Sequence, residues 1–256
     1  MAKWPGAHPV FVKEAKGAKF TDIDGNTYID FCLGDTGSMT GHSPDATIAA
    51  IKRQADIGIT SMLPTLDAAV VSKELAARFG LPKWQFTVTA TDANRHVIRY
   101  CRLITGRAKI IVIDRCYHGS VDETFATLDD AGNTVKREGN LGAPVDLAVT
   151  TRVVEFNDLA GMEAALAHGD VAAILMEPAM TNVGIVLPED GYLVAVQDLA
   201  KKYGALLIID ETHTISVGPG GMTQDLGLKP DFLTIGKAIA GGIPVGTFGM
   251  TEAVAN

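Results

Sequence analysis

Residues 171–176 read Val-Ala-Ala-Ile-Leu-Met, and residues 205–209 read Ala-Leu-Leu-Ile-Ile. Between these two apolar runs, residues 192–203 place apolar side chains along one stripe of a helix, at Leu193, Val196, Leu199 and Tyr203. Two fully apolar strands joined by an amphipathic helix are typical of parallel strands connected by a crossover. The stretch therefore predicts an α/β fold with a mostly parallel sheet and helices on both faces.

The same alternation continues on both sides of this unit. A helix at 91–105 is followed by an apolar strand at 109–113, and a strand at 148–154 precedes a short helix at 158–167. Further strands are expected at 232–235 and 245–250, and residues 251–256 begin a helix that stops after one turn. One turn does not form a stable helix alone, so we expect the chain to be part of a longer protein.

The N-terminal part has a different pattern. Residues 10–31 alternate short apolar runs with turn dipeptides such as Asp24-Gly25, which predicts a β-meander. Ser43-Pro44 predicts a helix whose cap is the serine, with Ile48, Ile51 and Ala55 on one face. Leu66, Val70 and Phe79 mark a second helix of similar length.

Composition excludes several classes of protein. The chain has 256 residues, of which 47% are hydrophobic, and 30 acidic residues against 22 basic ones give it a net charge of −8. A disordered chain is excluded by the apolar content, and the acidic balance disfavours nucleic acid and anionic membranes as partners. We predict a cytoplasmic protein for three reasons. The three cysteines form no CxxC pair, no apolar run reaches about 18 residues, and residues 1–6 contain no apolar leader.

Several catalytic motifs are missing. The six histidines, His8 among them, form no HExxH or other closely spaced pair, so we expect no metal site. There is no GxSxG motif and no GxGxxG motif after a strand. A phosphate-binding loop around Lys237 would need Gly at 231 and Ser or Thr at 238, where this chain has Asp231 and Ala238.

In a parallel sheet, ligands bind beyond the carboxyl ends of the strands, so the residues that follow each strand are the site candidates. Asp210 follows the strand 205–209, where a carboxylate either caps the next segment or points into the crevice. Lys237 follows the strand 232–235 among glycines and small apolar residues. It is either a surface lysine or an amine that apolar surroundings make nucleophilic enough for Schiff-base chemistry.

The two residues together suggest one cofactor. Pyridoxal phosphate needs a lysine amine and an acid that keeps its pyridine nitrogen protonated. The phosphate of this cofactor needs N–H donors. Free backbone N–H groups at the start of the helix 91–105, in Thr89-Ala90-Thr91-Asp92, can bind it. Tyr117 either stacks on the ring of the cofactor or is a core aromatic residue.

Three basic residues form a stripe on one face of the helix 91–105, at Arg95, Arg99 and Arg102. This stripe is either a solvated or subunit-facing edge, or a phosphate contact.

The chain resembles the class III (ω-type) aminotransferases of fold type I, a family that includes glutamate-1-semialdehyde 2,1-aminomutase. The resemblance covers nearly the whole chain and rests on motifs that follow the family's order. These motifs are Thr21-Asp-Ile-Asp-Gly-Asn-Thr-Tyr-Ile-Asp-Phe31, Thr105-Gly-Arg107, Cys116-Tyr-His-Gly119, Glu177-Pro178, Pro188-Glu-Asp-Gly-Tyr-Leu193, Leu207-Ile-Ile-Asp-Glu211 and Gly236-Lys237.

The resemblance implies a role for each candidate. Lys237 would be the Schiff-base lysine, Asp210 the partner of the pyridinium nitrogen and Tyr117 the stacking ring, with Ala90 and Thr91 at the phosphate. His213 stands where the family more often has Gln or Met. Asn182 matches the aminomutase pattern and would donate a hydrogen bond to the ring's phenolic oxygen, while its alternative is a turn residue before Gly184.

The phosphate motif departs from the family's Ser-Gly-Thr-Glu-Ala, because Ala90 occupies the glycine position. The resemblance also implies a domain plan: residues 1–40 contribute to a small domain, residues 41–256 form the large cofactor-binding domain, and the C-terminal small domain is absent. The implied function is amino transfer from an amino acid or amine to a keto acid or aldehyde, in a homodimer. The alternatives are intramolecular transfer of the aminomutase type, and a non-catalytic remnant.

Overall fold

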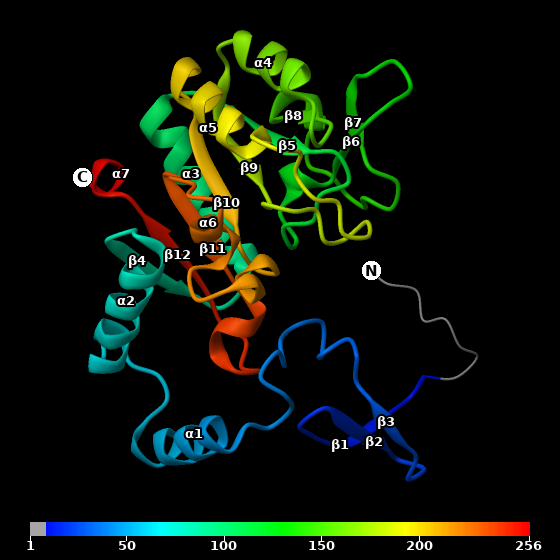
Figure 1. The fold of residues 1–256 in the computed structure, drawn as a ribbon, viewed down its shortest axis with the longest axis vertical. Helices are drawn as coiled ribbons and strands as arrows, with labels where there is room; N and C mark the ends of the chain where they lie inside the picture. Colours follow the sequence, from blue (N-terminus) through cyan, green and yellow to red (C-terminus); the bar gives the residue numbers. More distant parts are fainter. Residues whose placement is uncertain (1–8) are drawn as a thin grey trace. The chain divides into compact units, whose positions relative to one another are not determined.

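The computed structural model describes residues 9–256 (Figure 1). The described chain divides into two compact units. The first unit comprises the residues up to Pro64 together with Lys237–Ile243, and the second comprises Thr65–Gly236 and Pro244–Asn256. Residues 1–6, in which a leader was considered, and His8 lie outside the described residues. The domain boundary expected at residue 40 stays a prediction.

The first unit contains the predicted β-meander, a three-stranded antiparallel sheet of β1 (Val12–Lys16), β2 (Lys19–Asp22) and β3 (Thr27–Ile29). The side chain of Asp22 closes the turn between β2 and β3. Its carboxylate accepts hydrogen bonds from the backbone N–H groups of Asp24 and Asn26, and from the Tyr28 hydroxyl at 2.8 Å. The turn residues that predicted the meander therefore also hold its register.

Helix α1 (Asp45–Ile57) differs in detail from the prediction. Pro44 is the N-cap, with an extended ψ of 133°, and Ser43 lies outside the helix with a φ of 50°. The N-cap lies one residue later than predicted and no side chain caps the helix, so Ser43 does not supply the cap. No residue of α1 is buried, so the face predicted at Ile48 and Ile51 packs into no core.

Helix α2 (Leu66–Phe79) is present as predicted, and of the three residues that mark it only Phe79 is buried. Leu66 and Val70 are 86% and 67% exposed, whereas Leu75 and Phe79 are buried. Phe79 packs against Trp84 of the edge strand β4, with ring centroids 5.8 Å apart. Only the C-terminal half of α2 thus has apolar neighbours to pack against, which the periodicity of the helix does not reveal.

The second unit is built on a seven-stranded sheet in the order β4-β12-β11-β10-β9-β5-β8. The pairs β11–β10, β10–β9, β9–β5 and β5–β8 are parallel, while β12 runs antiparallel to β11 and β4. This confirms the mostly parallel sheet. The strands are β4 (Lys83–Thr87), β5 (Lys109–Ile113), β8 (Thr151–Val154), β9 (Val171–Met176), β10 (Leu206–Asp210), β11 (Phe232–Ile235) and β12 (Gly246–Met250).

Two strand predictions need correction. The strand expected at 148–154 begins only at Thr151, because the 3₁₀ turn Leu147–Val149 comes first. The carboxylate of Asp146 accepts the Ala148 N–H at 3.0 Å and so caps that turn. The strand expected at 205–209 is shifted by one residue, so Asp210 is the last residue of β10. The hairpin of β6 (Ala126–Leu128) and β7 (Thr134–Lys136) was not predicted.

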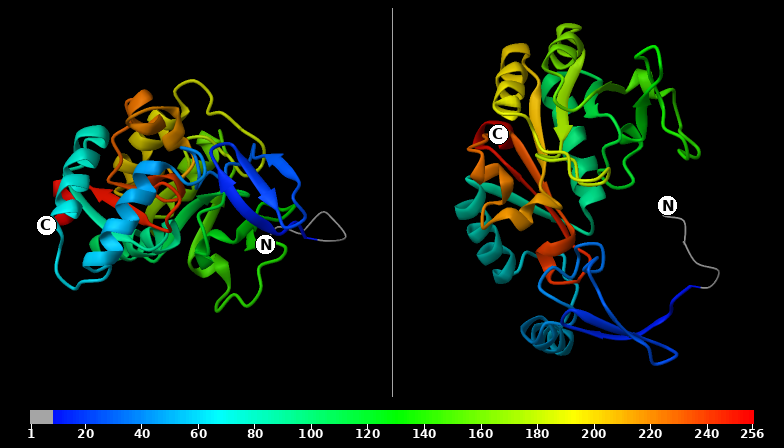
Figure 2. Two further views of the ribbon diagram at one scale, coloured as in Figure 1. Left: turned by 90° about the horizontal axis from the view of Figure 1, so that it is seen from below. Right: turned by 45° about the vertical axis from the view of Figure 1, so that its right-hand side comes forward.

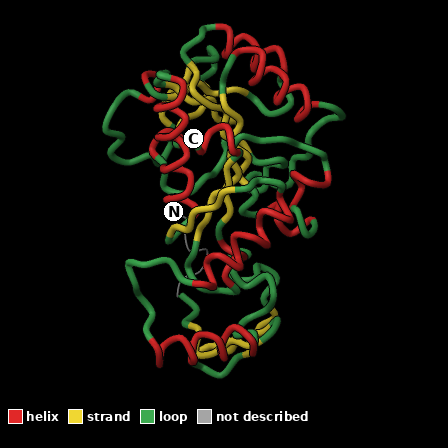
Figure 3. The backbone as a smooth tube through the Cα atoms, turned by 90° about the vertical axis from the view of Figure 1, so that its left-hand side faces the viewer, coloured by secondary structure: helices red, strands yellow, loops and turns green. Residues whose placement is uncertain are grey.

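Helices flank this sheet (Figures 2 and 3). All six residues of β9 are fully buried, and since strand side chains alternate between faces, both faces of the sheet are covered. The helices are α3 (Ala90–Thr105), α4 (Leu159–Ala167), α5 (Tyr192–Tyr203), α6 (Gly221–Asp225) and α7 (Glu252–Ala255). Within residues 9–256, no helix is both long enough and apolar enough to cross a membrane.

Candidate functional site

Asp210 is the centre of a buried hydrogen-bond network at the carboxyl end of β10. Asp210 is only 3% exposed. Its Oδ2 atom lies 2.8 Å from His118 Nδ1 and accepts the Asn94 amide at 3.0 Å, and its Oδ1 atom accepts the Thr212 N–H at 3.0 Å. The carboxylate is therefore held by three groups from different elements. The carboxylate points into the protein and also holds the Thr212 N–H of the following segment, while its orientation toward a ligand crevice stays a prediction.

His118 and Asn94 were missed by the sequence reasoning as site residues. His118 lies in the loop after β5, within the Cys116-Tyr-His-Gly119 motif, and is 1% exposed. Asn94 lies in α3, is fully buried, and accepts a hydrogen bond from the Thr234 hydroxyl of β11 at 2.8 Å. The only local signal was a histidine inside a recognised motif, and its partner is 92 positions away along the chain.

The network sets the charge of both members of the His118–Asp210 pair. Burial raises the pKa of Asp210, but the hydrogen bond and the positive charge of His118, together with the Thr212 and Asn94 donors, outweigh burial and lower it. For His118, burial opposes protonation, while the interactions with Cys116 and the hydrogen bond and charge of Asp210 more than compensate and raise its pKa well above 6.5. The two shifts favour an imidazolium next to an ionised carboxylate.

The N-terminus of α3 forms the second part of the site. Thr89 is the N-cap, and its Oγ1 accepts the Asp92 N–H at 3.2 Å, while the Ala93 N–H bonds to the Thr89 carbonyl. An α-helix leaves its first N–H groups without intrahelical partners, so those of Ala90 and Thr91 remain for an anion. The predicted phosphate residues are therefore placed at a helix start, as the sequence suggested.

Two glycines approach this helix start very closely. A Cβ on Gly119, whose φ is +81°, would lie 2.0 Å from Thr91 Oγ1, and the next N–H, that of Ser120, bonds to the same Oγ1 at 3.0 Å. A Cβ on Gly236 would lie 2.6 Å from the Cβ of Ala90. The loop after β5 and the end of β11 thus both pack directly on Ala90 and Thr91.

Replacing Gly119 with alanine is expected to lower the free energy of unfolding by about 2–5 kcal/mol. About 1–2 kcal/mol would come from the left-handed backbone, and about 1–3 kcal/mol from displacing the Thr91 side chain. Gly132→Ala is the matched control, because Gly132 has a φ of +79° but nothing within 4 Å of an added Cβ. Urea unfolding followed by circular dichroism measures both losses, and equal losses would rule out the close approach at Thr91.

The remaining predicted residues of the second unit lie near the surface. The Tyr117 residue is 43% exposed, so the alternative of a core aromatic residue is wrong. Asn182 is exposed, in the bend before Gly184. His213 is half-buried and directly precedes the 3₁₀ helix Thr214–Val217. The stacking, phenolic and ring contacts expected of these three residues stay predictions.

Lys237 directly follows Gly236 in the chain and begins the 3₁₀ helix Lys237–Ala240 of the first unit. Its Nζ atom lies 3.0 Å from Asp35 Oδ2. Its φ of +47° is in the left-handed region, which a residue with a side chain adopts at a cost and which is frequent at functional positions. The side chain is 21% exposed, so the alternative of a fully solvated surface lysine is not what the structure has.

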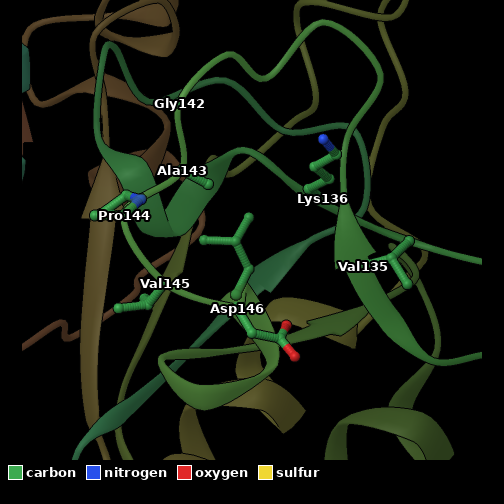
Figure 4. A pocket seen from close by; sticks show the side chains of 8 residues that line it. Val135, Lys136, Gly142, Ala143, Pro144, Val145 and Asp146 are labelled. Atoms are coloured by element: carbon green, nitrogen blue, oxygen red, sulfur yellow. The ribbon is translucent and has the colours of Figure 1, made fainter.

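Other charged features have structural partners. Of the basic stripe on α3, Arg102 bonds to Glu123 at 2.7 Å and Arg95 lies 3.5 Å from Asp122. A pocket near β7 is lined by none of the predicted site residues (Figure 4). Its lining residues are Val135, Lys136, Gly142, Ala143, Pro144, Val145, Asp146 and Leu147.

Comparison with known proteins identifies the family. The model of the aminotransferase class-III family matches residues 1–256. The chain belongs to the class-III aminotransferase family. This confirms the resemblance stated from the motifs.

Several relatives of this class-III chain are similar over nearly its whole length. A glutamate-1-semialdehyde 2,1-aminomutase from Sulfurihydrogenibium azorense is 36% identical over 248 residues, which are 95% of this chain and 58% of that protein. The crystal structure of a glutamate-1-semialdehyde aminomutase from Pseudomonas aeruginosa PAO1 matches with a TM-score of 0.96 and 56% identity, over 98% of this chain and 56% of that one. A lysine-to-alanine variant of an aminomutase from the same organism, in complex with PMP, matches with the same TM-score and 55% identity, over 98% of this chain and 56% of that one.

An ω-transaminase from Sphaerobacter thermophilus matches this class-III chain less closely, with a TM-score of 0.93 and 30% identity over 98% of this chain and 60% of that one. These solved structures confirm the expected fold class. The chain spans about 58% of the length of the curated relative and 56–60% of these solved chains.

Proposed function

We propose that this chain is the cofactor-binding part of an enzyme that uses pyridoxal phosphate to transfer an amino group between an amino acid or amine and a keto acid or aldehyde. The observation that carries the proposal is the buried, ionised Asp210, held by His118, Asn94 and Thr212 at the carboxyl edge of a parallel sheet. Membership of the class-III family and the similarity to an aminomutase in complex with PMP support it.

The residues of the candidate site fit this cofactor. A pyridinium nitrogen needs a carboxylate that stays ionised, and the low pKa of Asp210 meets that need. A phosphate needs N–H donors without intrahelical partners, and the start of α3 at Ala90 and Thr91 offers such donors. The methyl group of Ala90, which replaces the family's glycine, packs against Gly236, where a Cβ would lie 2.6 Å away.

We assign each candidate a role in amino transfer. Pyridoxal phosphate, when bound, supplies a ring that withdraws electrons from the substrate Cα. Asp210 would keep the ring nitrogen protonated, and the Lys237 amine would hold the cofactor and move a proton at the substrate Cα as general acid and base. Tyr117 would stack on the ring, Asn182 would donate a hydrogen bond to the phenolic oxygen, and His213 would lie against the ring.

Adding pyridoxal phosphate to the 256-residue chain is expected to produce a visible absorbance band. Borohydride should fix the cofactor onto Lys237, where peptide mass spectrometry locates it. Lys237→Ala is expected to remove both the band and the adduct, and in the full-length protein to lower the rate of amino transfer by about 10²–10⁴-fold, since this is the contribution of a positioned acid–base group.

Lys136→Ala is the control, because Lys136 is an exposed lysine of the second unit outside the proposed site. The control should keep the band and the adduct. The assignment fails if Lys237→Ala gives the same band, or if borohydride attaches the cofactor at other lysines to the same extent.

A second candidate is intramolecular transfer of the aminomutase type. It is favoured by the 56% identity to the aminomutase structure and by Asn182 at the position where the aminomutase pattern has it. An aminomutase turns over without an added keto acid, whereas a transaminase needs one. Turnover of a 1,2-amino aldehyde by the full-length protein without any keto acid would therefore favour the mutase.

The homodimer and the cytoplasmic location expected from the sequence stay predictions.

A further inference from the structure

The loop that follows β5 carries one exposed aromatic residue between two buried ones. Cys116 and His118 are 2% and 1% exposed, whereas Tyr117 between them is 43% exposed. The loop turns at both ends through left-handed residues, Arg115 with a φ of 58° and Gly119 with a φ of 81°. The Tyr117 side chain is thus carried by a short backbone segment with buried neighbours, and whatever holds that segment determines where the ring lies.

Both backbone carbonyls that flank Tyr117 accept a hydrogen bond from a distant side chain. The His118 carbonyl accepts the Asn94 amide of α3 at 3.2 Å. The Cys116 carbonyl accepts Nη1 of Arg137 at 2.9 Å. Arg137 directly follows β7, in the hairpin that the sequence did not predict. The segment is therefore held at one end by α3 and at the other end by the hairpin.

Arg137 is itself fixed in place. Its Nη2 atom donates to the Thr124 carbonyl at 2.9 Å, and its backbone N–H donates to the Phe125 carbonyl at 2.8 Å. Its guanidinium carbon lies 5.6 Å from the centroid of the Phe125 ring. The planar fork of an arginine bonds to two carbonyls at once, and hydrogen bonds from a charged donor are roughly twice as strong as neutral ones. The Cys116 carbonyl is thus tied to a rigid support.

The hairpin of β6 and β7 is tied to the large sheet (Figure 1). Asp114, which directly follows β5, accepts the Thr127 hydroxyl of β6 at 2.6 Å. The Thr134 hydroxyl of β7 accepts the N–H of Val153 in β8 at 3.1 Å. Asp114 is only 7% exposed, so its hydrogen bond to the hairpin is shielded from water. The hairpin is therefore anchored to two neighbouring strands, and the loop that it supports follows one of them.

We propose that Arg137 is a positioning residue that sets the orientation of Tyr117 by holding the Cys116 carbonyl, and that it thereby favours stacking of Tyr117 on the cofactor ring. The stacking rests on the function proposed above, whereas the hold on the loop is a property of the chain by itself. If Arg137 only stabilised the hairpin, its effect on the cofactor would not depend on Tyr117.

The first test measures hydrogen exchange in the 256-residue chain without cofactor. In Arg137→Gln, the peptide 114–121 is expected to exchange about 10-fold faster or more, because a hydrogen bond to a charged group contributes enough to change a local equilibrium by that factor. This peptide contains the N–H groups of Cys116 and Ser120, whose hydrogen bonds close the two ends of the loop. Mass spectrometry of the exchanged peptides measures the rate, and peptides of α5 should keep theirs.

Two further variants make the first test decisive. Lys136→Gln removes a positive charge from an exposed residue of the same hairpin and should leave the loop's exchange unchanged. If Arg137→Gln does not fold, Arg137→Lys keeps the charge but lacks the planar fork, and the loop should again exchange faster. The proposal is overturned by unchanged exchange in a folded Arg137 variant, by an equal rise in α5, or by the same rise in Lys136→Gln.

The second test asks whether Arg137 acts through Tyr117. Visible-band titration gives the dissociation constant of pyridoxal phosphate for Tyr117→Ala, Arg137→Gln and the double variant. Each single change is expected to weaken binding by about 2- to 10-fold, the size of an aromatic stacking contact. The double variant should bind no more weakly than Tyr117→Ala alone, because residues that act through one contact are not additive. Two effects that simply multiply would contradict a role through Tyr117.

The two tests separate this inference from the proposed function. If borohydride attaches the cofactor to Lys237 but the loop's exchange is unchanged in Arg137→Gln, the role of Arg137 fails and the proposed function stands. If exchange rises only in the loop but no cofactor is fixed on Lys237 in the unchanged chain, the hold of Arg137 on the loop is supported and the proposed function fails, together with the stacking.

Discussion

Asp210→Ala is expected to lower the free energy of unfolding by about 3–5 kcal/mol, because it leaves the buried imidazolium of His118 without its counter-charge. The same change also removes the acceptor of the Asn94 amide and the Thr212 N–H. Urea unfolding at neutral pH, followed by circular dichroism, measures the loss. No comparable effect is expected from Asp130→Ala, since Asp130 is exposed and surface changes usually stay within about 0.5 kcal/mol.

The effect of Asp210→Ala should depend on pH in a defined direction. The pKa of His118 is raised, so its contribution to stability is fully present below 6.5 and is lost as the pH rises through its folded-state pKa. The pKa of Asp210 is lowered, so its contribution is present above 3.8 and is lost as the pH falls through its folded-state pKa. The difference between wild type and variant should therefore be largest between pH 3.8 and 6.5. A difference that grows steadily above pH 6.5 would contradict the protonated state of His118.

Glu211→Ala is expected to lower the free energy of unfolding by at least about 3 kcal/mol, because each buried donor left without a partner costs about 1–3 kcal/mol. Glu211 is fully buried and accepts four hydrogen bonds, from the Thr214 hydroxyl, the Thr223 hydroxyl and the N–H groups of Met222 and Thr223. It therefore ties the end of β10 to α6. Thermal unfolding and urea unfolding both measure the loss.

Glu74→Ala serves as the comparison for Glu211→Ala. Glu74 is an exposed helix residue that pairs with Arg78 one turn later, and such a pair contributes about 0.3–0.5 kcal/mol. If the two glutamate variants unfold at the same urea concentration, the four hydrogen bonds of Glu211 contribute no net stability. A large loss confined to Glu211→Ala would show that the second acid of the Asp210-Glu211 pair has a structural role.

Elements with a single strong local signal were predictable from the sequence. The strands 109–113, 171–176 and 232–235 and the helix 192–203 have the predicted bounds, because full burial on both faces demands an unbroken apolar run. Elements whose burial depends on a distant neighbour were predicted less well. In α2 the apolar residues Leu66 and Val70 are exposed, since the buried residues of that helix, Leu75 and Phe79, lie in its second half.

The sequence by itself determined the parallel α/β sheet, the family and the candidate residues Asp210 and Lys237, because strands, helix caps and motifs are encoded by residues close together in the chain. Only the tertiary structure decided that Asp210 is held by His118 and Asn94, and that Arg137 holds the loop after β5. The physical reason is that the charge of a buried carboxylate depends on neighbours in space, and these neighbours come from the loop after β5 and from α3, far away along the chain.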